Sequence, residues 1–172
     1  MKEIIAKYLK NDFGEIEMPT NEKDKMKLVR ALLGLSLINR IDYWLDYSKD
    51  FLDNALPKEP FIRENELSLK DKSFRDTFSK LDNETKTKVG ELINSTVTGV
   101  VFSILTNLDQ FDFGDISIFL KPKSDDNTQI KITSDLDDLH DELSEWIYTF
   151  SKFREVLVVK EEDKYGTSYR LK

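Results

Sequence analysis

The chain has no cysteine among its 172 residues, and this absence excludes several kinds of site. Disulfide bonds, zinc–thiolate centres, iron–sulfur clusters and thiol nucleophiles all require cysteine. Histidine is almost as scarce, because His140 is the only one. The sequence also lacks a glycine-rich dinucleotide motif, a phosphate-binding loop and a nucleophile elbow. No motif therefore names a reaction, and we expect no cofactor, no bound metal and no enzymatic activity.

The sequence has few features of an exported or membrane-embedded protein. Its first segment, Met1–Glu15, carries too many charges for a secretory signal. Its longest apolar run, Val97–Leu108, is interrupted by Thr98 and Ser103 and falls short of the roughly 18 residues needed to cross a bilayer. The length suits one domain, and the aromatic content of 11% argues against disorder. We therefore expect a single cytoplasmic domain over residues 1–172.

The acidic excess is confined to one fifth of the chain. Between Asp109 and Glu142 there are ten acids and three bases, a balance of −7 that equals the net charge of the whole protein. Such a segment favours a cationic partner over a nucleic acid, because phosphates would be repelled. Basic residues elsewhere are matched by acids, so no basic stripe for nucleic acid is visible. The ten acids are Asp109, Asp112, Asp115, Asp125, Asp126, Asp135, Asp137, Asp138, Asp141 and Glu142.

Apolar residues recur with the period of an α-helix through most of the first 108 positions. This pattern predicts helices over Ile4–Leu9, Met26–Leu56, Ser68–Leu81 and Asn83–Leu108. Thr20 or Asn21 is expected to cap the second helix, and Asn83 the fourth.

The period then changes to two, which is typical of strands. Ile116–Leu120 and Gln129–Thr133 are predicted to pair as an antiparallel hairpin around a turn at Pro122–Thr128. A further helix follows from a cap at Ser134 or Asp135, and Glu155–Leu171 is predicted to form either a second hairpin or a helical extension with a tail. The fold class is therefore α+β, predominantly helical, with a small antiparallel β-sheet of hairpins toward the C-terminus.

Several packing expectations follow from the helical stripes. Val97–Leu108 is apolar or small on almost every face, which predicts a central, buried helix. Gly99 is expected to make a packing contact there. Gly34 is expected to mark a kink or a close approach of two helices. Trp44 and Tyr47 are three residues apart on a stripe, which favours a place in the core over an exposed aromatic patch.

His140 is the residue with the widest chemical range in the acidic segment. On a helix it would share a face with Asp137, Asp141 and Ser144. A histidine with two carboxylates could ligate a metal or form an acid–base pair. The favoured interpretation is simpler: Asp137 and Asp138 stabilise the first turn of a helix through its dipole, and His140 is a polar surface residue.

The segment Asp109–Asp115 places an acid at every third position and ends in Gly114-Asp115. A calcium loop needs acids at alternate positions, so the pattern does not match. It predicts a helix that ends near Asp109, then a tight turn at Gly114 with Phe111 and Phe113 anchored in the core. A partner-binding loop is the alternative, because aromatic residues beside acids make effective anchors.

Two further runs carry a family resemblance: Thr98–Phe102, leading through Leu108-Asp109 into a strand, and Asp138–Leu143. They resemble small acidic immunity proteins of bacterial contact-dependent growth-inhibition and polymorphic toxin systems. The resemblance covers roughly Thr98–Phe153 and implies a role class, with no catalytic residues to transfer. It implies a cytoplasmic protein that binds a cognate toxin domain.

The sequence therefore predicts an immunity protein that occludes a toxin, with a basic nuclease as the expected toxin class. It would act through an acidic surface with aromatic anchors. The alternatives are a metal-assisted hydrolase built around His140 with Asp137 or Asp141, and a regulatory or scaffold module. The residues expected to bind the partner are Asp109, Asp112, Asp115, Asp137, Asp138, Asp141, Glu142, Phe111 and Phe113.

Overall fold

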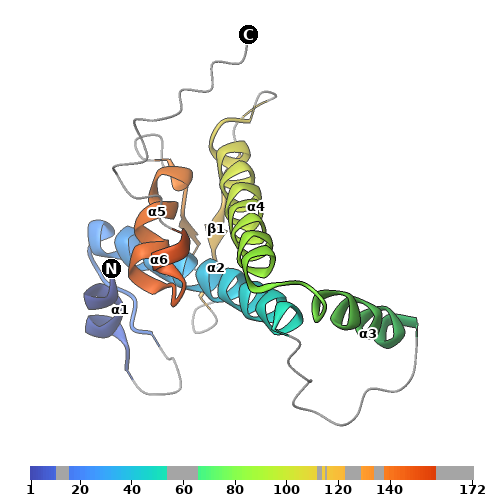
Figure 1. The fold of residues 1–172 in the computed structure, drawn as a ribbon. Helices are drawn as coiled ribbons and strands as arrows, with labels where there is room; N and C mark the ends of the chain where they lie inside the picture. Colours follow the sequence, from blue (N-terminus) through green and yellow to red (C-terminus); the bar gives the residue numbers. More distant parts are fainter. Residues whose placement is uncertain are drawn as a thin grey trace.

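The protein has a mostly helical α+β fold with a small two-stranded antiparallel sheet (Figure 1). The computed structural model describes residues 1–10, 16–53, 66–111, 114, 116–122, 129–133 and 138–157. Its elements are α1 (Lys2–Tyr8), α2 (Glu22–Leu52), α3 (Glu66–Phe78), α4 (Asn83–Asp109), β1 (Phe119–Leu120), β2 (Ile130–Lys131), α5 (Leu139–Phe150) and α6 (Arg154–Leu157).

The two long helices begin at side-chain caps that satisfy free backbone amides. Asn21 accepts a hydrogen bond from the Asp24 amide at 2.7 Å, which confirms one of the two expected caps of α2. The cap of α4 is Asp82, which accepts from the Thr85 amide at 2.8 Å. The expected cap, Asn83, is instead the first residue of that helix.

The predicted hairpin is present but shorter than its sequence pattern. Phe119 pairs with Lys131 and Leu120 with Ile130 in antiparallel register. The turn over residues 123–128 lies outside the described residues. So do Ser134 and Asp135, and α5 begins later, at Leu139, with Asp138 in the N-cap position. At the C-terminus, Arg154–Leu157 is helical, so the predicted second hairpin does not begin as a strand there; the residues after 157 lie outside the description.

The core lies where α2, α4 and α5 pack against one another, with β2 against α2. Trp146 of α5 is its largest fully buried side chain. A Cβ added to Gly34 of α2 would lie 2.5 Å from Cγ and Cδ1 of the Trp146 indole. The expected close approach at Gly34 is therefore confirmed, because only a residue without a side chain leaves room for the ring.

The prediction that α4 is a buried central helix is wrong. Of its residues only Leu105 is buried, while Leu92 is 67% exposed and Val100, Phe102 and Ile104 are about half exposed. The core elements cover one side of α4 (Figure 1). Gly99 does not make the expected packing contact with the residues that the structure describes, since a Cβ placed there would meet nothing within 4 Å.

The same helix corrects the expectation that no segment reaches membrane-spanning length. By length and composition alone, α4 is apolar enough to cross a bilayer. Its serines, threonines and asparagines interrupt the apolar run, but no charged residue occurs between Leu92 and Leu108. The average over the helix therefore stays apolar even though the local run is short.

Trp44 and Tyr47 also lie on the surface, contrary to the expected core position. Trp44 is 54% exposed, because Ile41 and Leu45 form the inward stripe of α2 at this level. The rings of Tyr43, Trp44 and Tyr47 contact one another edge to face, with centroids 5.5 and 5.6 Å apart. The end of α2 thus presents a surface row of aromatic rings.

Candidate functional site

The acidic segment joins the end of α4 to the start of α5. Asp109, the last residue of α4, accepts a hydrogen bond from the His140 backbone amide at 2.9 Å. Asp138 occupies the N-cap position of α5, but its side chain makes no capping hydrogen bond. Asp109 therefore satisfies a free amide of α5 from a neighbouring helix, and its negative charge lies at the positive end of the α5 dipole.

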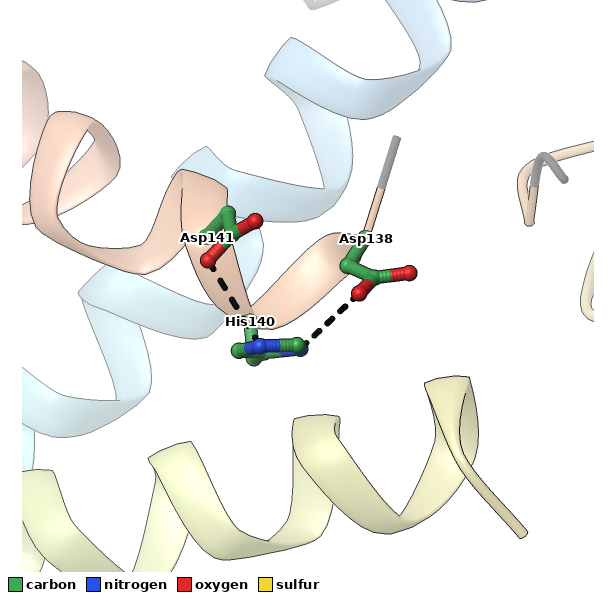
Figure 2. Close-up of side chains that lie close together, drawn as sticks. All are labelled: Asp138, His140 and Asp141. Carbon is green, nitrogen blue, oxygen red and sulfur yellow. Dashed lines mark ion pairs between the residues drawn. The ribbon is translucent and has the colours of Figure 1, made fainter. Parts of the chain in front are cut away.

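The same Asp109 oxygen also holds the histidine ring. His140 Nδ1 donates to Asp109 Oδ2 at 2.9 Å, and the Asp109 side chain is only 4% exposed. Asp141 Oδ1 lies 3.5 Å from Nε2, and Asp138 Oδ2 lies 4.0 Å from Nδ1 (Figure 2). The Phe102 ring meets the imidazole edge to face, with centroids 5.4 Å apart. His140 is therefore fixed between two helices, and its expected role as a simple surface residue is wrong.

The surrounding carboxylates stabilise the charged imidazolium. The hydrogen bond to Asp109 is the largest cause that raises the pKa of His140 above its ordinary 6.5; burial opposes it, and the charges of Asp141 and Asp138 add to it. A raised folded-state pKa means that folding takes up a proton. The resulting stability is fully present below pH 6.5 and is lost as the pH rises through the folded-state pKa.

We therefore expect the free energy of unfolding to fall between pH 6 and pH 9, as the imidazolium of the folded protein loses its proton. Urea denaturation at half-unit pH intervals measures this change. In Asp109→Asn the slope should be smaller, since the largest cause of the raised pKa of His140 is removed while Asp141 and Asp138 remain. An equal slope in this variant would show that His140 is not its source.

The Asp138, His140 and Asp141 cluster has the composition of a weak metal site. One ligand atom from each residue lies within 4.8 Å of the others. Asp109 holds Nδ1, which leaves Nε2 for a metal, as in carboxylate–histidine–metal arrangements. The same carboxylates favour a proton on Nε2, and a protonated nitrogen has no lone pair to offer. A metal ion at this cluster would therefore compete with the proton on Nε2.

The Glu142 side chain also makes a contact inside the protein. Its carboxylate pairs with the buried guanidinium of Arg30 in α2, and Arg30 Nε donates to the Ile132 carbonyl at 3.2 Å. Burial raises the pKa of Glu142 even though Arg30 opposes the shift. This pair joins α2, α5 and the segment after β2.

The loop after α4 places its aromatic residue differently from the prediction. Gly114 has φ +152°, and its amide donates to the Phe111 carbonyl at 3.3 Å, so the expected turn at this glycine is confirmed. Phe111 is exposed rather than anchored in the core. The neighbouring candidates Asp112, Phe113 and Asp115, and Asp137 before α5, lie outside the described residues.

The accessible acids line a large cleft between α1, the start of α2, and α5. The cleft encloses about 1180 Å³, and Asp138, Asp141 and Glu145 lie along its α5 wall. Their spacing of three and four residues puts them on one face of the helix. Lys23 and Lys27 line the opposite wall. Sequence reasoning missed Glu145, although its position four residues after Asp141 could have suggested it.

Comparison of the chain with models of known protein families, with curated proteins and with solved structures finds no match. The resemblance to immunity proteins therefore stays a prediction. The geometry shows exposed carboxylates on α5 beside a histidine whose ring is already held by other side chains.

Proposed function

We propose that this protein binds a cognate protein toxin and blocks it sterically, as an immunity protein does, without chemistry of its own. The observation that supports this most directly is the row of accessible acids on α5. Asp141 is 78% exposed, and Asp138 and Glu145 share its wall of the cleft. They project from a helix that is fixed to α4 through Asp109 and to α2 through Glu142 and Arg30.

A rigid acidic surface suits a basic partner. A nuclease keeps a cationic cleft for its polyanionic substrate, and carboxylates on an inhibitor can occupy that cleft. Long-range attraction increases the rate of encounter, while buried aromatic anchors supply most of the affinity. Exposed Phe111, next to the acidic segment, is the described aromatic residue best placed to serve as an anchor.

The division between exposed and internal acids makes the proposal testable. The partner for the experiment is sought in the neighbouring gene: if that gene encodes a toxin, the C-terminal domain of the toxin is purified as a catalytically inactive variant. We expect Asp138→Asn, Asp141→Asn and Glu145→Gln together to lower the association rate constant about tenfold at low salt. Stopped-flow mixing at several ionic strengths measures it, and the deficit should shrink as salt screens the charges.

A control variant changes the net charge equally at other surface sites. Asp50→Asn, Asp76→Asn and Glu91→Gln neutralise three exposed acids on α2, α3 and α4. These changes should lower the rate less than twofold, since steering depends on local charge. Equal effects of the two triple variants would contradict docking at α5. Failure of the wild-type chain to bind the toxin domain would contradict the proposed function itself.

The metal-assisted hydrolase is the second candidate, and the Asp138, His140 and Asp141 cluster is the observation that favours it. Calorimetric titration with Zn²⁺ and Mn²⁺ distinguishes a metal-assisted hydrolase from an immunity protein. Saturable binding that is lost in His140→Ala would support the hydrolase, and the absence of saturable binding would contradict it. A regulatory or scaffold role remains the third candidate, and an unrelated neighbouring gene would favour it.

A further inference from the structure

An apolar groove lies away from the acidic surface, where the end of α2 meets α3 and the first half of α4. It encloses about 320 Å³. Its walls are formed by Tyr47, Phe51 and Leu52 of α2, Phe74 and Phe78 of α3, and Ile93 of α4. Pockets of this size and lining accept small organic molecules with a large apolar part.

The aromatic rings of the groove are held in fixed orientations by their neighbours. Phe74 and Phe78 are stacked with centroids 6.2 Å apart and planes 13° apart. Tyr47 meets Phe51 edge to face at 4.8 Å, and the Arg75 guanidinium lies 4.2 Å from the centre of the Phe51 ring. Arg75 also donates to the Asp50 carbonyl, which links α3 to the end of α2. Because these contacts set the ring positions, a ligand would enter a preformed site.

One charged side chain lines this groove among the residues that the structure describes. Lys70 of α3 lies at the side of the groove, with Nζ 5.8 Å from the centre of the Phe74 ring. No aspartate or glutamate appears among the described lining residues. The groove therefore combines apolar walls with a single cation, although the protein as a whole is acidic.

We propose that this groove binds a small amphipathic carboxylate, such as a medium-length fatty acid. Its apolar chain would lie against Phe51, Phe74 and Ile93, and its carboxylate would pair with the Lys70 ammonium. A neutral molecule would lack the attraction to the ammonium, and a cationic amphiphile would be repelled by it. This site is separate from the toxin-binding surface, and it does not depend on the proposed function.

The experiment is a calorimetric titration of the full chain with decanoate, decanol and decylamine, each below its micelle concentration. We expect decanoate to bind saturably with a stoichiometry of one. Decanol should bind at least about fivefold more weakly, and decylamine weaker still. The Trp44 ring lies 5.6 Å from Tyr47 of the groove, whereas Trp146 is fully buried, so a change in tryptophan emission would report occupancy.

Two charge-reversal variants on α3 provide a matched pair. Lys70→Glu should weaken decanoate binding about tenfold or more, because a carboxylate would then face the ligand carboxylate. Lys72→Glu, also exposed on α3 but outside the groove, should change the affinity less than twofold. Because both changes are on the surface, equal urea midpoints would confirm intact folding of each variant.

A third variant tests the apolar part of the site. Ile93→Asp places a charge on the α4 wall, and it should abolish decanoate binding while Leu92→Asp, on the exposed side of α4, leaves it intact. The proposal would be overturned by equal affinities for decanoate and decylamine, by equal affinities of Lys70→Glu and Lys72→Glu, or by no saturable heat with decanoate.

Discussion

Gly34→Ala should destabilise the protein by about 2 kcal/mol or more, although alanine is the better helix former. The added Cβ would lie 2.5–2.6 Å from three atoms of the Trp146 indole, closer than carbon atoms approach without a shift in structure. Trp146 is fully buried between helices, so the ring cannot move outward without opening the core. The gain in helix propensity, about 1 kcal/mol, offsets only part of this strain. Urea denaturation at constant pH measures the difference.

Gly99→Ala is the matched control, because this glycine also lies inside a long helix. A Cβ there would meet nothing within 4 Å, so only the propensity term remains, and we expect stabilisation by up to about 1 kcal/mol. The two substitutions are chemically identical and should differ in sign. If Gly34→Ala were also stabilising, Trp146 would not occupy the position described.

A double variant tests the cause more directly. Trp146→Leu alone removes the large ring and should be destabilising, by roughly 3 kcal/mol. In that background Gly34→Ala should lose most of its penalty, because the space taken by the indole is then free. The coupling between the two residues should therefore exceed about 1 kcal/mol in a double-mutant cycle.

Local patterns in the sequence predicted the helices, the Asn21 cap, the hairpin and the close approach at Gly34. These features depend on residues within a few positions of each other, or on the lack of a side chain. The burial of α4 depends instead on how many elements cover it. The composition of residues 97–108 suits a helix covered on all sides, but the core elements cover only one, which leaves Val100, Phe102 and Ile104 exposed. The sequence alone does not show how many elements will cover a given helix.

The candidate site also combines contacts that are local in the sequence with contacts between distant residues. The sequence drew attention to His140 and its acidic neighbours, because they are adjacent in the chain, but it favoured a simple surface position for the histidine. It could not show that Asp109, 31 residues earlier, holds the ring, or that Arg30 is 112 residues from its partner Glu142. Because of these long-range contacts, Asp109 and Glu142, which were expected to bind the partner, instead contact other parts of the protein. Asp138 and Asp141 stay accessible.

Arg30→Met should cost about 3–5 kcal/mol, because it leaves the partly buried carboxylate of Glu142 without its cation. The Ile132 carbonyl also loses the hydrogen bond from Arg30 Nε, so the contact between α2 and the segment after β2 weakens. Replacing both partners, in Arg30→Met/Glu142→Leu, should restore stability to within about 1–2 kcal/mol of the wild type. Burial raises the pKa of Glu142 despite the nearby guanidinium, so its desolvation outweighs the attraction. A double variant as unstable as Arg30→Met would contradict this account.

The substitution Glu142→Gln tests whether Glu142 stabilises the fold or binds the toxin. The amide can still accept a hydrogen bond from Arg30, so the loss of stability should be only about 1–2 kcal/mol. Toxin association should change less than after loss of the other cleft acids, because the Glu142 carboxylate lines the same cleft but is paired with Arg30. Neutralising Asp138, Asp141 and Glu145 should give the opposite pattern, with slower association and little loss of stability. Unfolding midpoints and association rates measured on both variants would show whether the acids of this segment divide into these two groups, as their contacts require.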